Sequence, residues 1–176
     1  MAFNTPAAYG LYSPNVALRE VTCTLNQAGF ANEDICLLLS PDHPISTAVR
    51  DARILDPGQG TAHRDGMIGW LSSFGGVSIP SVGFLARSRA FFHAMMKGLV
   101  SPAPRSGSRT LAALGFPELE ADRFEDQLQR RGALIYISCA EVARSNWAIQ
   151  LLQRTGAEET ATLEDKNAEL TSRAAA

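Results

Sequence analysis

The sequence predicts an α+β protein in which helices pack on a mostly antiparallel sheet. Two blocks at the ends of the chain carry this prediction, because each has the pattern of a strand, a helix and a second strand. The composition agrees, since 45% of the 176 residues are hydrophobic and 19% are charged, as is usual for a chain that buries a core. The formal net charge of −2 provides no general attraction to nucleic acid, and no nucleic-acid partner is expected.

The first block occupies roughly the first 40 residues. Residues 7–12 are short and apolar-aromatic and predict a strand. Ser13 and Pro14 predict the cap and first turn of a helix, and Gly29 predicts its end. The run 34–39 predicts a strand that is buried on both faces. The helix between the two strands has an apolar face at helical spacing, made by Leu18, Val21, Leu25 and Ala28.

The last block repeats this order. Pro117 predicts the start of a helix that ends at Gly132, and residues 133–139 form the clearest strand pattern of the chain. A further helix follows and ends at Gly156, and residues 160–162 add a short final strand. The residues predicted to face the core from these two helices are Ala121, Phe124 and Leu128, then Val142, Ile149 and Leu152.

Strand, helix and strand at each end, without a long parallel series, predict a ferredoxin-like α/β sandwich. Helices are expected on one face of the sheet, and the apolar strands favour some cover on the other face as well. Residues 1–163 are expected to form a single domain with a helical hairpin inserted at about 61–100. Residues 164–176 are polar and alanine-rich and predict a flexible C-terminal tail.

The central segment suggests how the protein acts. After Pro80, the chain to Leu99 has the pattern of one helix that is apolar on more than one side, which a small domain has little core to absorb. Self-association into a homo-oligomer is therefore the first interpretation, internal core the second and a membrane-surface helix the third. The residues predicted to carry self-association are Trp70, Phe74, Phe84, Phe91, Phe92, Met95 and Met96.

No pattern of residues predicts catalysis, a metal or a cofactor. The three cysteines and three histidines are scattered, without the spacing of a zinc site, and no phosphate-binding loop or nucleophile motif is present. Free cysteines without a signal peptide or a membrane span predict a cytoplasmic protein. The alternative to a non-catalytic, self-associating protein is a small-ligand sensing module, with the ligand between sheet and hairpin near Tyr136 and Trp147.

Short motifs near both ends follow, in order, the pattern of a known family. They are Tyr9-Gly10-Leu11-Tyr12, Ala28-Gly29-Phe30, Asn32-Glu33-Asp34-Ile35, Leu114-Gly115-Phe116-Pro117-Glu118-Leu119-Glu120-Ala121, Arg123-Phe124-Glu125, Gly132-Ala133-Leu134-Ile135 and Thr155-Gly156-Ala157-Glu158. In these segments the chain resembles the heat-induced general stress protein family of bacteria. The resemblance implies a small stress-associated protein without enzyme activity. The central segment departs from that family, with fewer glycines and more bulky or basic residues, such as Trp70 and Arg87.

Overall fold

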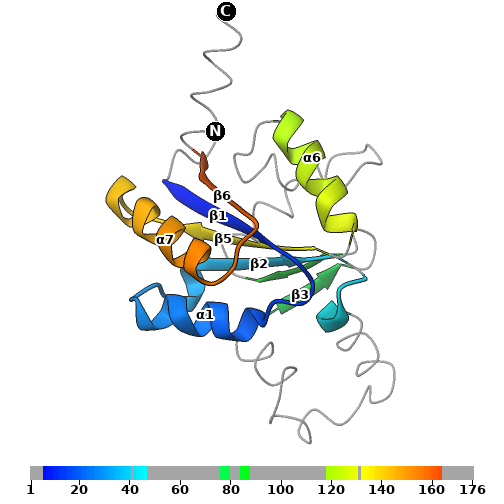
Figure 1. Cartoon of the computed structure of the whole chain (residues 1–176), viewed down its shortest axis with the longest axis horizontal. Helices are drawn as coiled ribbons and strands as arrows, with labels where there is room; N and C mark the ends of the chain where they lie inside the picture. The colour runs from blue at the N-terminus through cyan, green and yellow to red at the C-terminus, as the bar shows by residue number, and fades with distance from the viewer. Residues whose placement is uncertain are drawn as a thin grey trace, which may run out of the picture.

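The computed structural model describes residues 6–40, 42–46, 76–79, 84–87, 118–130 and 132–163 (Figure 1). Among the described elements, strands and helices follow one another along the chain, except that three strands are consecutive in the middle. In chain order they are β1 (Ala7–Tyr12), α1 (Leu18–Gln27), a 3₁₀ turn (Asn32–Asp34), β2 (Ile35–Leu39), β3 (Gly76–Ile79), β4 (Phe84–Arg87), α6 (Glu118–Gln129), β5 (Ala133–Ser138), α7 (Val142–Arg154) and β6 (Glu159–Thr162).

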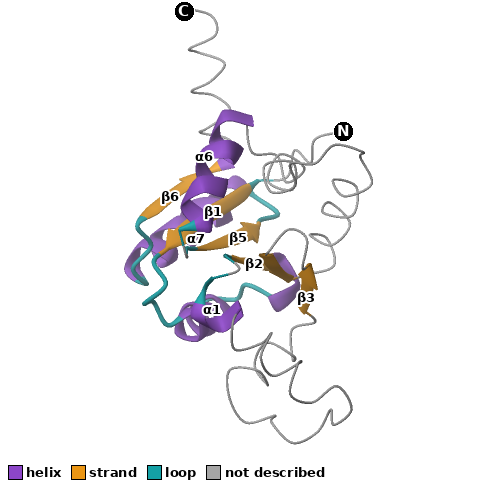
Figure 2. Ribbon diagram, turned by 90° about the vertical axis from the view of Figure 1, so that its right-hand side faces the viewer, coloured by secondary structure: helices purple, strands orange, loops and turns teal. Residues whose placement is uncertain are grey.

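The strands form one six-stranded sheet in the order β3-β4-β2-β5-β1-β6. Figure 2 shows the succession from β6 through β1, β5 and β2 to β3. All of its neighbouring strands pair antiparallel. Strand β5 lies between β1 and β2, and strand β1 lies between β5 and β6, so α1 and α7 each connect two strands that are not neighbours. The predicted α+β class with a mostly antiparallel sheet is thus confirmed.

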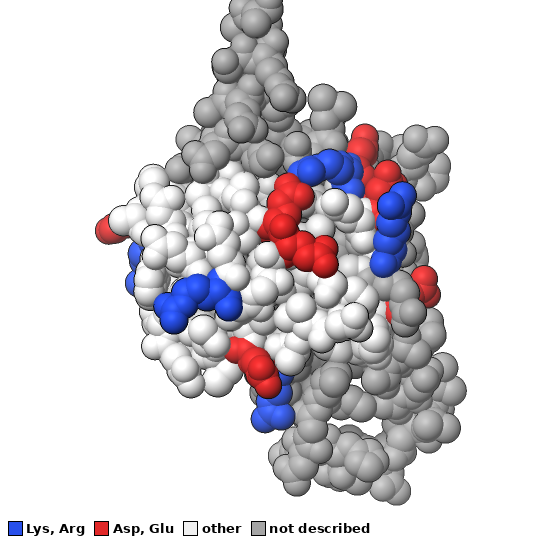
Figure 3. Space-filling view, in the orientation of Figure 1, with Lys and Arg blue, Asp and Glu red and all other residues white. Residues whose placement is uncertain are grey.

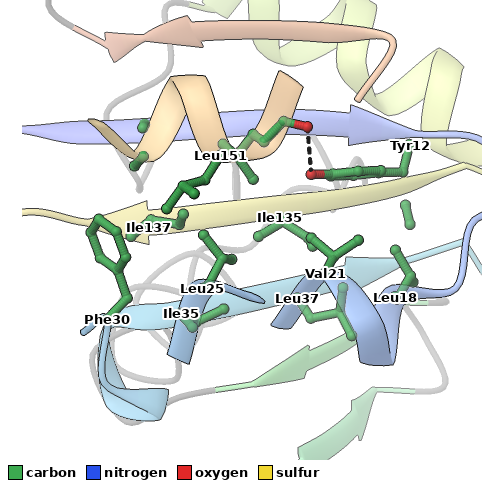
Figure 4. Close-up of a cluster of buried hydrophobic side chains, with 14 of the residues drawn as sticks. Tyr12, Leu18, Val21, Leu25, Phe30, Ile35, Leu37, Ile135, Ile137 and Leu151 are labelled. Atoms are coloured by element: carbon green, nitrogen blue, oxygen red, sulfur yellow. Dashed lines mark hydrogen bonds between the residues drawn. The ribbon is translucent and has the colours of Figure 1, made fainter. Parts of the chain in front are cut away.

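Both faces of the sheet are buried at β1, β2 and β5, because nearly every residue of these strands is buried and alternate residues point to opposite sides. One face packs against α1 and α7, with Leu25, Leu151 and Ile135 in its core (Figure 4). The opposite face packs against Ala121, Phe124 and Leu128 of α6. Cover on both faces was expected, but the expectation that the helices share one face is wrong. The second face is covered, at least in part, by α6, one of the predicted helices.

The β1–α1–β2 and β5–α7–β6 units are related by a consistent offset. Adding 127 to a residue number turns Leu25 into Leu152 and Gly29 into Gly156, and both glycines have φ of 90°. The turns match bond for bond: the N–H groups of Phe30 and Ala157 donate to Leu25 and Leu152 carbonyls at 3.0 and 3.1 Å. This is the Schellman arrangement that follows many helices.

The same offset turns Tyr9 into Tyr136, and these two tyrosines are opposite one another in the β1–β5 ladder. A pseudo-two-fold axis therefore passes between them, relating the two units. The 3₁₀ turn Asn32–Asp34 makes the first unit three residues longer before its second strand begins. The repeat is therefore seen in backbone geometry as well as in the order of elements.

We predict similar losses of stability for Gly29→Ala and Gly156→Ala. Both positions require a left-handed backbone, which costs a residue with a Cβ about 1–2 kcal/mol. Steric overlap adds little, since the nearest atom to a Cβ at 29 is 3.9 Å away and nothing lies within 4 Å at 156. Urea unfolding followed by circular dichroism measures both, with Gln27→Ala on the exposed side of α1 as the control. A loss in one variant alone would contradict equivalence of the two turns.

Two sequence predictions within these units are wrong. The helix predicted to be capped by Ser13 and Pro14 begins at Leu18, after a turn in which the Val16 N–H donates to the Ser13 carbonyl. Val142 was expected in the core but is 50% exposed. The buried positions of α7 are instead taken by small and leucine side chains, namely Ser145, Ala148, Leu151 and Leu152.

The inserted helical hairpin predicted at about 61–100 is wrong where the structure describes this segment. Residues 76–79 and 84–87 form the antiparallel strands β3 and β4, and β4 pairs with β2. The remainder of that segment lies outside the described residues, as does the predicted tail at 164–176.

Candidate interaction site

The structure describes one of the seven residues predicted to carry self-association. Phe84 is the first residue of β4, in the sheet rather than in a helix. Its backbone pairs with Ile79 of β3. The other six lie outside the described residues: Trp70, Phe74, Phe91, Phe92, Met95 and Met96.

Strands β3 and β4 extend the sheet beyond β2. Leu85 of β4 is paired with Leu39 of β2, and the β3–β4 ladder runs from Gly76–Arg87 to Ile79–Phe84. Strand β3 is therefore the outermost of the described strands at this end of the sheet. An edge strand offers outward-facing N–H and C=O groups to another strand, which makes it a natural place for association.

At the opposite edge, side chains of β6 form a salt bridge and a hydrogen bond with side chains of α6 and α7. The Arg123 guanidinium of α6 forms a salt bridge with the Glu159 carboxylate at 2.5 Å, and the guanidinium also lies 4.8 Å from the Phe124 ring centre. The Gln153 amide of α7 donates to the Thr160 hydroxyl at 3.0 Å. The two ends of the sheet therefore differ in charge. Strand β6 contains the charged residue Glu159, whereas β3, with the sequence Gly-Val-Ser-Ile, contains none.

Two tyrosines and a cysteine form a row across the sheet on the α6 side. The ladders place Tyr9 opposite Tyr136, and Tyr136 opposite Cys36. The Phe124 ring meets Tyr9 edge to face, with 5.0 Å between ring centres. Burial, with smaller contributions from the neighbouring Cys36 and Cys139, raises the pKa of Tyr136 to about 12. Tyr136 therefore stays a neutral phenol at physiological pH and is not a ready proton acceptor.

A third tyrosine joins the two units on the other face. The Tyr12 hydroxyl donates to the Leu152 carbonyl at 3.2 Å (Figure 4), and it shares a hydrogen bond with the Thr155 hydroxyl at 2.9 Å. Burial raises the pKa of Tyr12 to about 12, and the bond to Thr155 lowers it by less. Tyr12 connects β1 to the end of α7, which is a structural role.

The hypothesis that Tyr136 and Trp147 line one ligand site is wrong. Tyr136 belongs to the cluster under α6, whereas Trp147 lies on α7, which covers the opposite face. Trp147 is 42% exposed. Val142, also exposed, is five residues away, which at about 100° per residue places the two about 140° apart around the helix. They do not form one apolar patch.

Two of the three thiols and the His43 ring are buried. Burial raises the pKa of Cys139 to about 11, and its Sγ lies 3.7 Å from the Ile137 carbonyl. Cys36 is buried, and Cys23 is exposed. His43 is buried, and its Nδ1 accepts a hydrogen bond from the Ile45 N–H at 3.2 Å, which fixes the proton of the neutral ring on Nε2.

Charges and possible metal ligands do not define a further site in the described part of the chain. No group of three or more His, Cys, Asp or Glu side chains is arranged to hold a metal among these residues. In the view of Figure 3, acidic and basic side chains lie near one another rather than in patches of one sign. Among the helices that the structure describes, none has the length and apolar character to cross a bilayer.

Sequence reasoning missed the strand pair of residues 76–87, although a signal was present. Val77-Ser78-Ile79 alternates apolar and polar residues, and Gly75-Gly76 before it and Pro80-Ser81-Val82-Gly83 after it are typical boundaries of strands. The abundance of apolar residues downstream favoured a helix instead.

Comparison with known proteins does not assign this chain to a family. No family model, no curated protein and no solved structure matches this chain. The class of protein that the structure itself defines is a mixed α/β protein with an antiparallel sheet and helices.

Proposed function

We propose that this protein is a non-catalytic, stress-associated interaction protein that self-associates through its central segment. The core would be a ferredoxin-like scaffold, and the segment from about 61 to 100 would carry the contacts between copies. The motifs near both ends that resemble the general stress proteins support the stress association. The three free cysteines are in keeping with the reducing cytoplasm that the proposal includes.

The ferredoxin-like part of the proposal is supported by strand order. Without β3 and β4, the sheet reads β2-β5-β1-β6, and its strands are connected in the order β-α-β-α-β-α-β with α6 as the extra helix. The split β–α–β connections through α1 and α7, both on one face, are those of a ferredoxin-like sandwich.

The observation that carries the self-association is the position of β3. The central segment contributes the strand pair β3–β4, and this pair brings the segment to one end of the sheet, with β3 outermost. A segment anchored in this way is fixed to the core by main-chain bonds at Leu85 while its outer strand remains at the edge. Association through the segment would then leave the rest of the core intact.

Changing both Phe91 and Phe92 to Ser should lower the solution mass. The wild-type protein is expected to be larger than one chain at micromolar concentration, and the double variant is expected to shift toward the monomer, because two large apolar contacts are lost. Light scattering after size exclusion gives the mass, and electron microscopy of the same peak gives the shape of the assembly.

Trp147→Ser is the matched control. It also removes an exposed aromatic side chain, but from α7, outside the proposed contact segment. Its assembly should equal that of the wild type. A compact wild-type monomer at micromolar concentration would overturn the proposed function.

A further inference from the structure

Strand β3 has an edge without the usual protection against strand pairing. Residues Gly76–Ile79 contain no charged residue and no proline, which are the devices that commonly keep an edge strand from joining another chain. In the part of the chain that the structure describes, β4 is the strand that pairs with β3. None of the other described strands pairs with the outer side of β3, and an uncharged edge of this kind can accept a further strand.

The far edge of the sheet is protected by comparison. In strand β6, the Glu159 carboxylate forms a salt bridge with the Arg123 guanidinium, and the Thr160 hydroxyl accepts a hydrogen bond from the Gln153 amide. A charge at this edge disfavours addition of a strand. The two ends of one sheet thus have opposite properties, and strand addition is favoured at β3.

We infer that β3 of one copy pairs antiparallel with β3 of a second copy across a two-fold axis, joining the two sheets into one. This inference rests on the proposed self-association and names its contact. A second copy fits because an uncharged strand meets itself without opposing like charges in any antiparallel register. The arrangement also closes, because each copy uses its β3 edge once and the protected β6 strands become the two outer ends.

The strand pairing sets the register and is too short to supply all of the affinity. Four residues span about 13 Å, so the apolar side chains of the neighbouring sequence are needed to add buried area. This division explains why one segment combines an uncharged strand with many large apolar residues. Main-chain bonds would fix the orientation of the copies, and the apolar residues would stabilise the contact.

Single cysteines test the pairing directly. In a Cys23→Ser background, which removes the exposed thiol, Val77→Cys and Ser78→Cys each place one thiol in the edge strand. Mild oxidation should give a disulfide-linked dimer in at least one of the two variants, because one of these positions lies next to the axis in either register. Thr160→Cys in β6 is the control and should give none. A linked dimer at 160, or none at 77 and 78, overturns the inference.

Proline substitutions in β3 distinguish the effect of losing an outward hydrogen bond from the effect of losing a hydrogen bond to β4. Successive N–H groups of a strand point to opposite sides, so one of Val77→Pro and Ser78→Pro removes a bond to β4 and the other removes an outward bond. The outward variant should raise the dimer Kd roughly 30-fold, since the symmetric dimer loses two bonds, with the unfolding midpoint nearly unchanged.

The two proposals fail in different ways. Wild-type protein that is monomeric by light scattering overturns both. An oligomer whose Kd is unchanged in both proline variants, and which forms no link at 77 or 78, overturns the edge pairing and leaves self-association standing.

Discussion

Phe124→Ala should lower the free energy of unfolding by about 3–5 kcal/mol, the usual cost of removing a buried phenylalanine side chain. Phe124 is fully buried in the cluster beneath α6, and its ring meets Tyr9 at 5.0 Å between centres. The change leaves a cavity at the contact between α6 and β1, on one face of the sheet. Equilibrium unfolding in urea measures the effect.

Arg123→Ala is the neighbouring control. It removes the salt bridge to Glu159, but the Arg123 side chain is 43% exposed, so the loss should be about 1 kcal/mol or less. A Phe124→Ala loss as small as that of Arg123→Ala would contradict the packing of α6 on this face.

Alkaline pH should destabilise the protein by about 5 kcal/mol between pH 10 and 12. Burial raises the pKa values of Tyr12 and Tyr136 from 10.0 to about 12. As pH rises through 10, the tyrosines of the unfolded chain lose their protons first, so unfolding becomes more favourable until the folded tyrosines also ionise near pH 12. A shift of this size corresponds to about 2–3 kcal/mol for each residue.

The measurement is the free energy of unfolding across this pH range, with tyrosinate absorbance as a direct titration of the folded protein. Tyr136→Phe should remove about half of the decrease. Tyr12→Phe should remove a similar part but also lower stability at neutral pH, because the bonds to Leu152 and Thr155 are lost. A decrease of equal size in wild type and Tyr136→Phe would show that Tyr136 does not cause it.

The two terminal units were predictable because their signals are local. The strand at residues 7–12 has the predicted bounds, and the helix-ending roles of Gly29 and Gly156 are confirmed by their positive φ. A left-handed turn after a helix requires little information from the rest of the chain, since glycine adopts it at little cost. The repeat was also visible, as Leu-x-x-x-Gly at Leu25 and again at Leu152.

The features that sequence failed to predict depend on packing between distant segments. The side of the sheet that α6 covers is set by tertiary contacts, since the apolar stripe of the helix fits either face. The apolar character of Val142 predicts a core position, but buried positions of this helix are taken by the smaller Ser145 and Ala148. Strands β3 and β4 are four residues each, too short for periodicity to separate from a helix.

The position of β5 has a consequence for synthesis of the chain on the ribosome. Strands β1 and β2 are made early, yet neither pairs with the other, and the strand between them is complete only at Ser138. Of the strands described, β1 pairs only with β5 and β6, which are both made after residue 132. The apolar β1 strand of the nascent chain therefore stays unpaired until most of the protein has been made, and the part of the sheet that contains β1 folds late. In a chain that stops before β5, strands β1 and β2 are both present, but the strand that lies between them in the sheet is missing.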